Sequence, residues 1–208
     1  MFLLLFKLFF HFALLSFIRY NTARRNKGVS IVLKIFTTQL VGYFNSIQEK
    51  EEIHIEDSSR AIAQAIVGDG HVYFHGFHEM MAVCYEAVLG QETLPKAKFL
   101  FEGGKKANLT SIDRLVIAAS PNDHTDAISL AKEAKEQGVT VIGLSVEKDH
   151  GGNDSFISEC DFHINIHLNS PLVPTDSGER ICTPTVMAAL YGYYALFLTT
   201  KEILDDYL

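Results

Sequence analysis

Ser120, Asn122 and Thr125 place two hydroxyl groups and one side-chain amide in a short segment directly after the apolar run at residues 115–119. Such groups at the start of a helix can hold an anion such as phosphate, because the first N–H groups of the helix are free and its dipole favours negative charge. The same residue types are also good helix N-caps. The segment therefore predicts either a phosphate-binding loop or an ordinary helix start.

Three further polar segments accompany this loop, at residues 75–79, 149–153 and 175–180. Each follows a predicted strand or precedes a predicted helix. In an open parallel sheet, ligands bind beyond the carboxyl ends of the strands. We therefore expect all four loops at one edge of the sheet.

The elements that must position these loops alternate between apolar strands and amphipathic helices. The predicted strands are residues 71–75, 97–101, 115–119, 139–146 and 161–168. The predicted helices are residues 33–48, 55–67, 79–89, 123–137 and 183–204. Strands that are apolar throughout are typical of burial on both faces, and strand–helix alternation implies right-handed crossovers. The pattern predicts an α/β fold, a three-layer αβα sandwich with a five-stranded, mostly parallel sheet.

The charge distribution argues against nucleic acid as a partner. The chain has 208 residues and a formal net charge of −7, but residues 1–31 hold five of its 18 basic side chains and no acidic one. From Val32 onward, 13 basic residues therefore face 25 acidic ones. Such a surface repels phosphate backbones.

The first 31 residues differ from the rest, and two interpretations of them are open. Residues 1–18 contain 15 apolar residues and are followed by a basic run. They form either a membrane anchor that leaves the domain on the cytoplasmic side, or an extension upstream of a true start at Val32. Both predict a single domain over residues 32–208 in the cytoplasm, in contact with a membrane only if residues 1–31 are native.

The three cysteines predict neither a disulfide framework nor a thiolate metal site, because they are odd in number and far apart. Cys84 lies in an apolar helical run and is interpreted as a core residue. His163 and His167 would lie about 13 Å apart on one strand, too far to share an ion. We expect no metal and no cofactor.

Residues 113–146, DRLVIAASPNDHTDAISLAKEAKEQGVTVIGLSV, resemble the signature of the SIS (sugar isomerase) family. In that signature a strand ends in S-x-S-G-x-T, and the helix runs on to A-K-x-x-G before the next strand. Ser120 and Thr125 match the first Ser and the Thr, whereas Asn122 replaces the second Ser and Asp123 replaces the Gly. The resemblance extends more loosely from about Leu33 to the end. It includes a group of uncharacterised small bacterial SIS-like proteins and, more distantly, phosphoheptose isomerases.

The resemblance implies a doubly wound, flavodoxin-like sheet, a homodimer and a phosphosugar ligand. In the family, the hydroxyls and amides of this loop hold the sugar phosphate, which implies that role for Ser120, Thr125 and, by position, Asn122. The predicted binding set also contains loop residues at the same edge, namely Gly76, His124 and Ser177.

Catalysis would require a carboxylate base and a proton shuttle, because an aldose–ketose isomerase moves a proton between adjacent carbons. The candidates are His78, Glu79 and Glu179. Each has a simpler interpretation. The two glutamates can be carboxylates near a helix start that the helix dipole favours, and His78 can stack on Phe77 or cap a helix.

Three functional hypotheses follow. The first is a SIS-domain protein that binds a phosphosugar or another carbohydrate derivative in a regulatory or unassigned role. The second is an aldose–ketose phosphosugar isomerase of the phosphoheptose isomerase type. The third is a membrane-tethered scaffold without an active site. The altered loop and the unplaced base favour the first.

Overall fold

The computed structural model describes residues 31–146 and 155–207. These residues fall into two compact units. One comprises residues 31–41 and Leu172–Cys182, and the other comprises the remainder. A helix at residues 31–50 begins the described chain.

The larger unit is built on a five-stranded sheet in which every pairing is parallel. Its strands are β1 (Val72–Gly76), β2 (Ala97–Phe99), β5 (Arg114–Ala119), β6 (Thr140–Ser145) and β7 (Phe162–Asn165). They lie in the order β2-β1-β5-β6-β7. The predicted parallel sheet is therefore confirmed.

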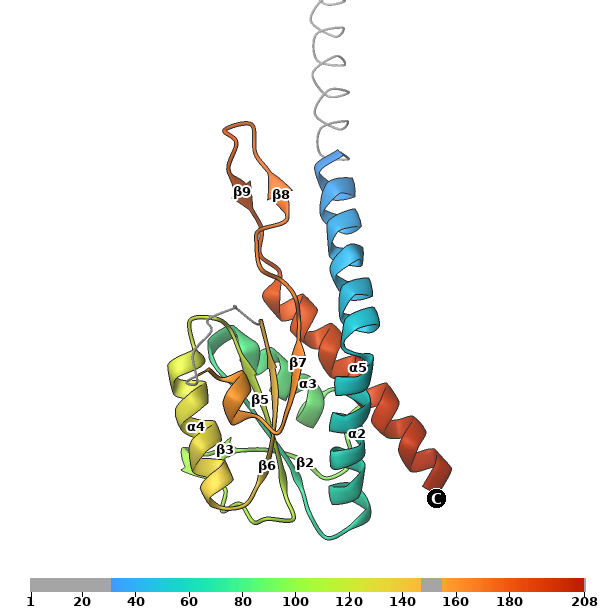
Figure 1. Ribbon diagram of the computed structural model, residues 1–208, viewed down its shortest axis with the longest axis vertical. Helices are drawn as coiled ribbons and strands as arrows, with labels where there is room; N and C mark the ends of the chain where they lie inside the picture. The colour runs from blue at the N-terminus through green and yellow to red at the C-terminus, as the bar shows by residue number, and fades with distance from the viewer. Residues whose placement is uncertain (1–30, 147–154, 208) are drawn as a thin grey trace, which may run out of the picture. The chain divides into compact units, whose positions relative to one another are not determined.

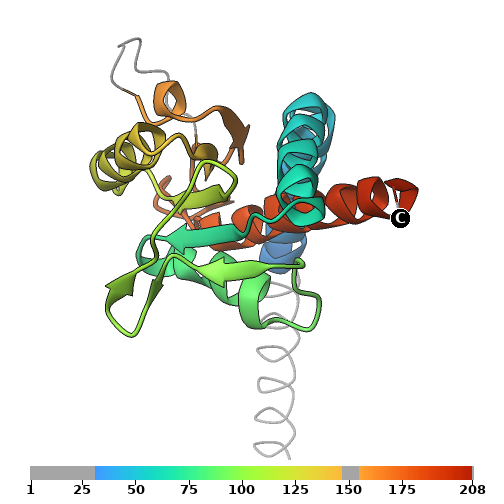
Figure 2. The ribbon, with the colours of Figure 1, turned by 90° about the horizontal axis from the view of Figure 1, so that it is seen from below.

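The sheet is covered on both faces, as a three-layer fold requires. Its helices are α2 (Glu52–Val67), α3 (Met81–Leu89), α4 (His124–Glu136) and α5 (Thr185–Tyr207). Helix α4 packs on one face, and α2, α3 and α5 pack on the other (Figures 1 and 2). Two short 3-10 helices, η1 (His78–Met80) and η2 (Ile157–Glu159), follow β1 and precede β7.

Alternating side chains of the strands fill two hydrophobic layers. Leu115, Ile117 and Ala119 of β5 face α4 and are fully buried. On the other face, Phe74 meets Tyr193 of α5 edge to face, with 6.1 Å between ring centroids. Cys84 of α3 is also fully buried, which confirms it as a core residue.

Two predicted strands end earlier than their apolar runs. The run at 97–101 ends as β2 at Phe99, because the chain then turns into a hairpin of β3 (Phe101–Glu102) and β4 (Lys105–Lys106). Gly103 and Gly104 make that turn with φ values of +57° and +76°. The run at 161–168 ends at Asn165, and His167 adopts a left-handed φ of +54°, which a strand does not accommodate.

The segment 175–180 lies in the smaller unit, in a hairpin of β8 (Val173–Pro174) and β9 (Arg180–Ile181). Thr175 N–H donates to the Glu179 carbonyl oxygen at 2.8 Å, and Leu172 N–H donates to that of Cys182 at 2.8 Å. The sequence pattern missed this hairpin, and it missed β3 and β4, because two-residue strands are too short to show a period.

In the described part of the chain, no helix combines the length and the hydrophobicity needed to cross a membrane. Residues 1–30, on which the membrane-anchor hypothesis depends, lie outside the described residues. That hypothesis therefore gains no support from the structure.

Close packing across β6 makes Gly143 sensitive to substitution. A Cβ atom there would lie 2.6 Å from Cys160 Sγ and 2.9 Å from His163 Cδ2. We expect Gly143→Ala to lower the free energy of unfolding by about 1–3 kcal/mol, because the neighbouring side chains must shift. Chemical denaturation measures this change.

Gly42→Ala is the matched control, since a Cβ at residue 42 meets nothing within 4 Å. It replaces a glycine within the helix at 31–50, where alanine should raise stability by roughly 0.5–1 kcal/mol. Equal denaturation midpoints for Gly143→Ala and the wild type would contradict the packing described here.

Candidate functional site

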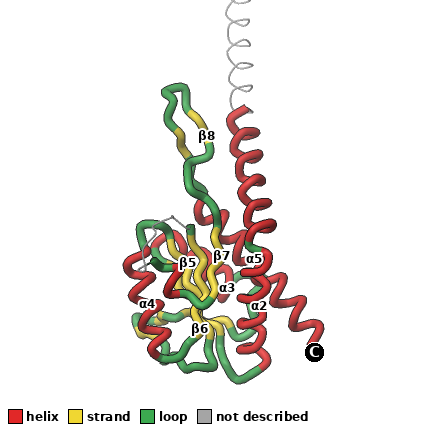
Figure 3. The backbone as a smooth tube through the Cα atoms, in the orientation of Figure 1, coloured by secondary structure: helices red, strands yellow, loops and turns green. Residues whose placement is uncertain are grey.

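Strands β1 and β5 form the topological switch point of the sheet. From β1 the chain continues outward to β2, whereas from β5 it continues in the opposite direction to β6. Figure 3 shows β5, β6 and β7 between α4 and α2. The loops that follow β1 and β5 therefore leave the sheet side by side and diverge, which is where open α/β sheets bind ligands.

The loop after β5 folds around the carboxylate of Asp123. Ser120 donates to Asp123 Oδ2 twice, from its backbone N–H at 3.0 Å and from Oγ at 2.6 Å. Asp123 stands at the N-cap position of α4, but its side chain makes no capping bond to the helix. The negative charge at the start of α4 is thus supplied by the protein itself.

His78 joins the loop after β1 to this carboxylate. Its Nδ1 lies 2.8 Å from Asp123 Oδ1, with the imidazole side chain 74% exposed and the carboxylate only 3% exposed. His78 has a φ of +46°, a left-handed conformation that a non-glycine residue rarely adopts. Strained residues of this kind cluster at functional sites.

The hydrogen bonds keep this buried carboxylate ionised. Burial alone would raise the pKa of Asp123, but the bonds from Ser120 Oγ, His78 and the Ser120 N–H outweigh burial and hold the pKa below its usual value. A carboxylate accepts hydrogen bonds but cannot donate them. His78 Nδ1 must therefore carry the hydrogen of this bond, and in the neutral form of the ring Nε2 is then an acceptor.

The same bonding pattern recurs at the opposite edge of the sheet. Thr110 donates to Asp113 Oδ2 from N–H at 2.8 Å and from Oγ1 at 2.7 Å, and His71 N–H donates to Oδ1 at 2.8 Å. That edge carries no helix start beside the aspartate, because β5 follows directly. The Ser120–Asp123 turn is thus a local motif that recurs in this chain. It differs from the Thr110–Asp113 turn because it lies at the start of α4 and holds the exposed imidazole of His78.

Gly76, one of the predicted binding residues, has a steric role in this site. A Cβ atom on Gly76 would lie 2.3 Å from the carbonyl oxygen of Met80. Only glycine therefore lets η1 fold back against the end of β1, which places His78 within reach of Asp123.

The other predicted residues of these two loops lie near Asp123 and His78 in the sequence. Asn122 and Thr125 are exposed at the start of α4. His124 is half-buried, with its ring centroid 6.0 Å from that of Phe156. Glu79 is exposed on η1, next to His78.

Two of the predicted residues, Ser177 and Glu179, belong to the smaller unit and are exposed. Ser177 Oγ lies 2.8 Å from Thr175 Oγ1. The loop at 149–153 falls outside the described residues. The site that the structure assembles is therefore formed by the loops after β1 and β5.

A second buried carboxylate, which sequence reasoning missed, lies at the end of β7. Glu51 Oε1 is 2.7 Å from His167 Nε2, and Oε2 is 3.0 Å from His54 Nδ1 and accepts the Asn165 N–H at 3.1 Å. Burial would raise the pKa of Glu51, but these bonds lower it. Glu51 thus ties the start of α2 to the sheet.

Two of the three hydrogen bonds described for Glu51 in this second cluster join residues over 110 positions apart in sequence. No local pattern could have revealed it. His163, the other histidine of the predicted β7 region, lies 2.9 Å from Ser145 Oγ instead. Burial lowers the pKa of His163 to about 4, so the ring is neutral at physiological pH.

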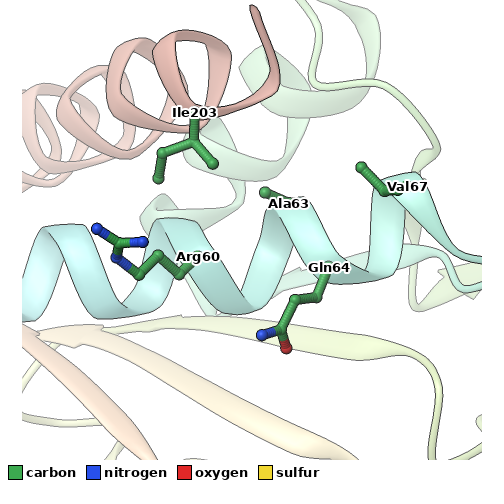
Figure 4. A pocket seen from close by; sticks show the side chains of 5 residues that line it. All are labelled: Arg60, Ala63, Gln64, Val67 and Ile203. Carbon is green, nitrogen blue, oxygen red and sulfur yellow. The ribbon is translucent and has the colours of Figure 1, made fainter. Parts of the chain in front are cut away.

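A cavity of about 380 Å³ lies away from both clusters, between α2 and α5. Arg60, Ala63, Gln64 and Val67 from α2 and Ile203 from α5 line it (Figure 4). Arg60 is paired with Glu56. These lining residues include none from the loops after β1 and β5. Among the residues described, no three potential metal ligands converge on one point.

Replacing Asp123 by Asn tests the role of its charge in the fold. The amide cannot accept hydrogen bonds at both of its terminal atoms, so we expect the free energy of unfolding at pH 7 to fall by about 1–3 kcal/mol. Because the folded-state pKa of Asp123 is depressed, its contribution is complete above the unfolded pKa of about 3.9 and is lost as the pH falls through the folded value. The gap between wild type and Asp123→Asn should therefore narrow below about pH 4.

Urea titrations from pH 7 to pH 3 measure this gap. Asp126→Asn serves as control, because Asp126 is an exposed carboxylate in the first turn of the same helix. It removes the same charge without breaking the Ser120 loop. A gap that stays constant across the pH range would refute an ionised, hydrogen-bonded Asp123.

Comparisons with known proteins place this chain in a family and its fold in a wider group. The family model described as "Domain of unknown function (DUF2529)" matches residues 32–204. "Uncharacterized protein YwjG" of Bacillus subtilis (strain 168) is 41% identical over 177 residues, which cover 85% of this chain and 99% of that protein.

Solved structures show the same architecture at low sequence identity. A phosphoheptose isomerase from Francisella tularensis aligns with a TM-score of 0.58 and 14% identity, over 86% of this chain and 98% of that chain. The sugar isomerase domain of an RpiR transcription factor from Sphaerobacter thermophilus aligns with a TM-score of 0.54 and 17% identity, over 84% and 97%. The chain therefore belongs to the DUF2529 family and has the SIS fold.

Proposed function

We propose that this protein binds a phosphosugar or a related carbohydrate derivative at the switch point between β1 and β5. The observation that supports this function is the bonded series Ser120–Asp123–His78, which joins the two loops where α/β sheets bind ligands. A buried carboxylate that orients an exposed imidazole is a feature of recognition and catalytic sites.

The groups around the pair suit a polyhydroxylated ligand. Asn122 and Thr125 are exposed beside the pair and can each donate and accept hydrogen bonds. The fold is compatible with two kinds of sugar-related protein, since one structural neighbour is a sugar isomerase domain of a transcription factor and another is a phosphoheptose isomerase.

Binding without turnover is the form of this function that the geometry favours. A base that removes a proton from carbon must have a free, basic carboxylate. Asp123 has a lowered pKa, and both of its oxygens accept hydrogen bonds. A sensing or regulatory role is therefore our first proposal.

An aldose–ketose isomerase remains the second candidate because of His78. Its Nδ1 is fixed by Asp123, so Nε2 could carry a proton between a ligand hydroxyl and water. The strained backbone at His78 is consistent with that role.

A thermal-shift panel of hexose, pentose and heptose derivatives, each with and without phosphate, tests binding. At a hundred times its dissociation constant, a true ligand adds about 2.7 kcal/mol to stability. Thr125→Ala and His78→Ala should weaken that shift, because both side chains are exposed at the site.

Thr93→Ala is the matched control, since Thr93 is an exposed threonine in the segment before β2. It should respond to ligand as the wild type does. The proposed function fails if no sugar derivative stabilises the wild type, or if both site variants respond as Thr93→Ala does.

Deuterium exchange separates binding from isomerisation. Any stabilising sugar is incubated with the protein in D2O, and the protons on its first two carbons are followed by NMR. We expect no enzyme-dependent incorporation, because the buried carboxylate at the described site, Asp123, accepts hydrogen bonds at both of its oxygens. Incorporation that disappears in His78→Gln would establish the isomerase instead.

A further inference from the structure

We infer that Asp123 sets the class of ligand: the site takes an unphosphorylated sugar that presents an amine or hydroxyl to His78, and it excludes a phosphate group at the start of α4. This inference rests on the proposed carbohydrate-binding function and narrows it. Three observations carry it.

The first is that the Ser120 donors are already used. A phosphate held by the first Ser of the SIS signature would need the N–H and O–H groups of Ser120, and Ser120 gives both of them to Asp123 Oδ2, at 3.0 and 2.6 Å. The carboxylate side chain is only 3% exposed and also pairs with His78. Asp123 therefore fills the position of an anion, where the SIS signature has glycine.

The second is the sign of the local charge. Residues 74–83 and 118–127, which surround the pair, contain Glu79, Asp123 and Asp126 but no lysine or arginine. An ionised phosphate placed among three carboxylates meets repulsion, and the basic side chains of these two segments are three histidines. An ammonium group meets attraction, and a hydroxyl meets neither.

The third is the direction of hydrogen bonding. Asp123 accepts, so the bond at 2.8 Å requires the His78 proton on Nδ1, and the 74% exposed ring offers Nε2 as an acceptor. Sugar hydroxyls and amines can donate to Nε2. A phosphate dianion has no proton to donate, so it cannot bond to Nε2 in this tautomer of the neutral ring.

Inorganic phosphate and one matched pair of sugars, glucosamine and glucosamine 6-phosphate, are the probes. They are titrated by calorimetry into the full-length wild type, Asp123→Gly and Asp123→Asn. Asp123→Gly restores the glycine of the SIS signature and frees both Ser120 donors. Asp123→Asn keeps the side-chain volume and so provides a test if the glycine variant is poorly folded.

Asp113→Asn is the control. Asp113 accepts hydrogen bonds from the N–H and the hydroxyl of Thr110 and from the backbone N–H of His71, but no helix begins beside it. Circular dichroism first establishes that each variant is folded. We expect the wild type and Asp113→Asn to show no phosphate binding and at least a tenfold preference for glucosamine over its 6-phosphate. Both Asp123 variants should bind inorganic phosphate and lose that preference.

The inference is overturned if the wild type binds glucosamine 6-phosphate as tightly as glucosamine, or if folded Asp123 variants gain no affinity for phosphate. Those results would leave the carbohydrate-binding function standing. If no sugar in the wider panel binds the wild type, the proposed function itself fails and this inference fails with it.

Discussion

The parallel pairing of β1 with β5 is the interaction on which the site depends. It sets Val72 against Arg114 at one end and Gly76 against Ala118 at the other, so both strands end at the same level. Strand β1 is then followed by a glycine turn and η1, and β5 is followed by the Ser120 loop and α4. Because Gly76 has no side chain, η1 returns close enough for His78 to reach Asp123. A change of register between the two strands would separate these loops.

Three buried carboxylates share one physical solution. Asp113, Asp123 and Glu51 each accept at least one backbone N–H and lie within bonding or ion-pair distance of a histidine. Burial of a charge is costly unless such partners compensate it, and in each case they hold the pKa of the carboxyl below its usual value. Asp113 and Glu51 tie secondary-structure elements together. Asp123 does the same for the loops after β1 and β5, and it holds the 74% exposed imidazole of His78 beside the start of α4.

The loop after β5 lies where the SIS signature predicts a loop between a strand and a helix, but Asp123 gives it different hydrogen bonds. The hydroxyl of Ser120 and the start of α4 occupy the places that the SIS resemblance predicted. The aspartate that replaces glycine turns its carboxylate inward and takes the donors of Ser120. In the proposed site, Asp123 thereby takes the donors of Ser120 and holds the imidazole of His78, from the loop after β1, beside the start of α4.

The sequence by itself determined the three layers, the parallel sheet and the edge of that sheet at which ligand-binding loops were expected, because buried parallel strands and amphipathic helices leave periodic patterns in neighbouring residues. It also identified Ser120, Thr125 and His78 as residues of that edge. Only the tertiary structure decided their partners. The Asp123–His78 bond joins residues 45 positions apart, and the Glu51–His167 bond joins residues 116 apart. Such contacts depend on how strands are paired and on where a glycine permits close approach, and neither is written in the local spacing of residue types.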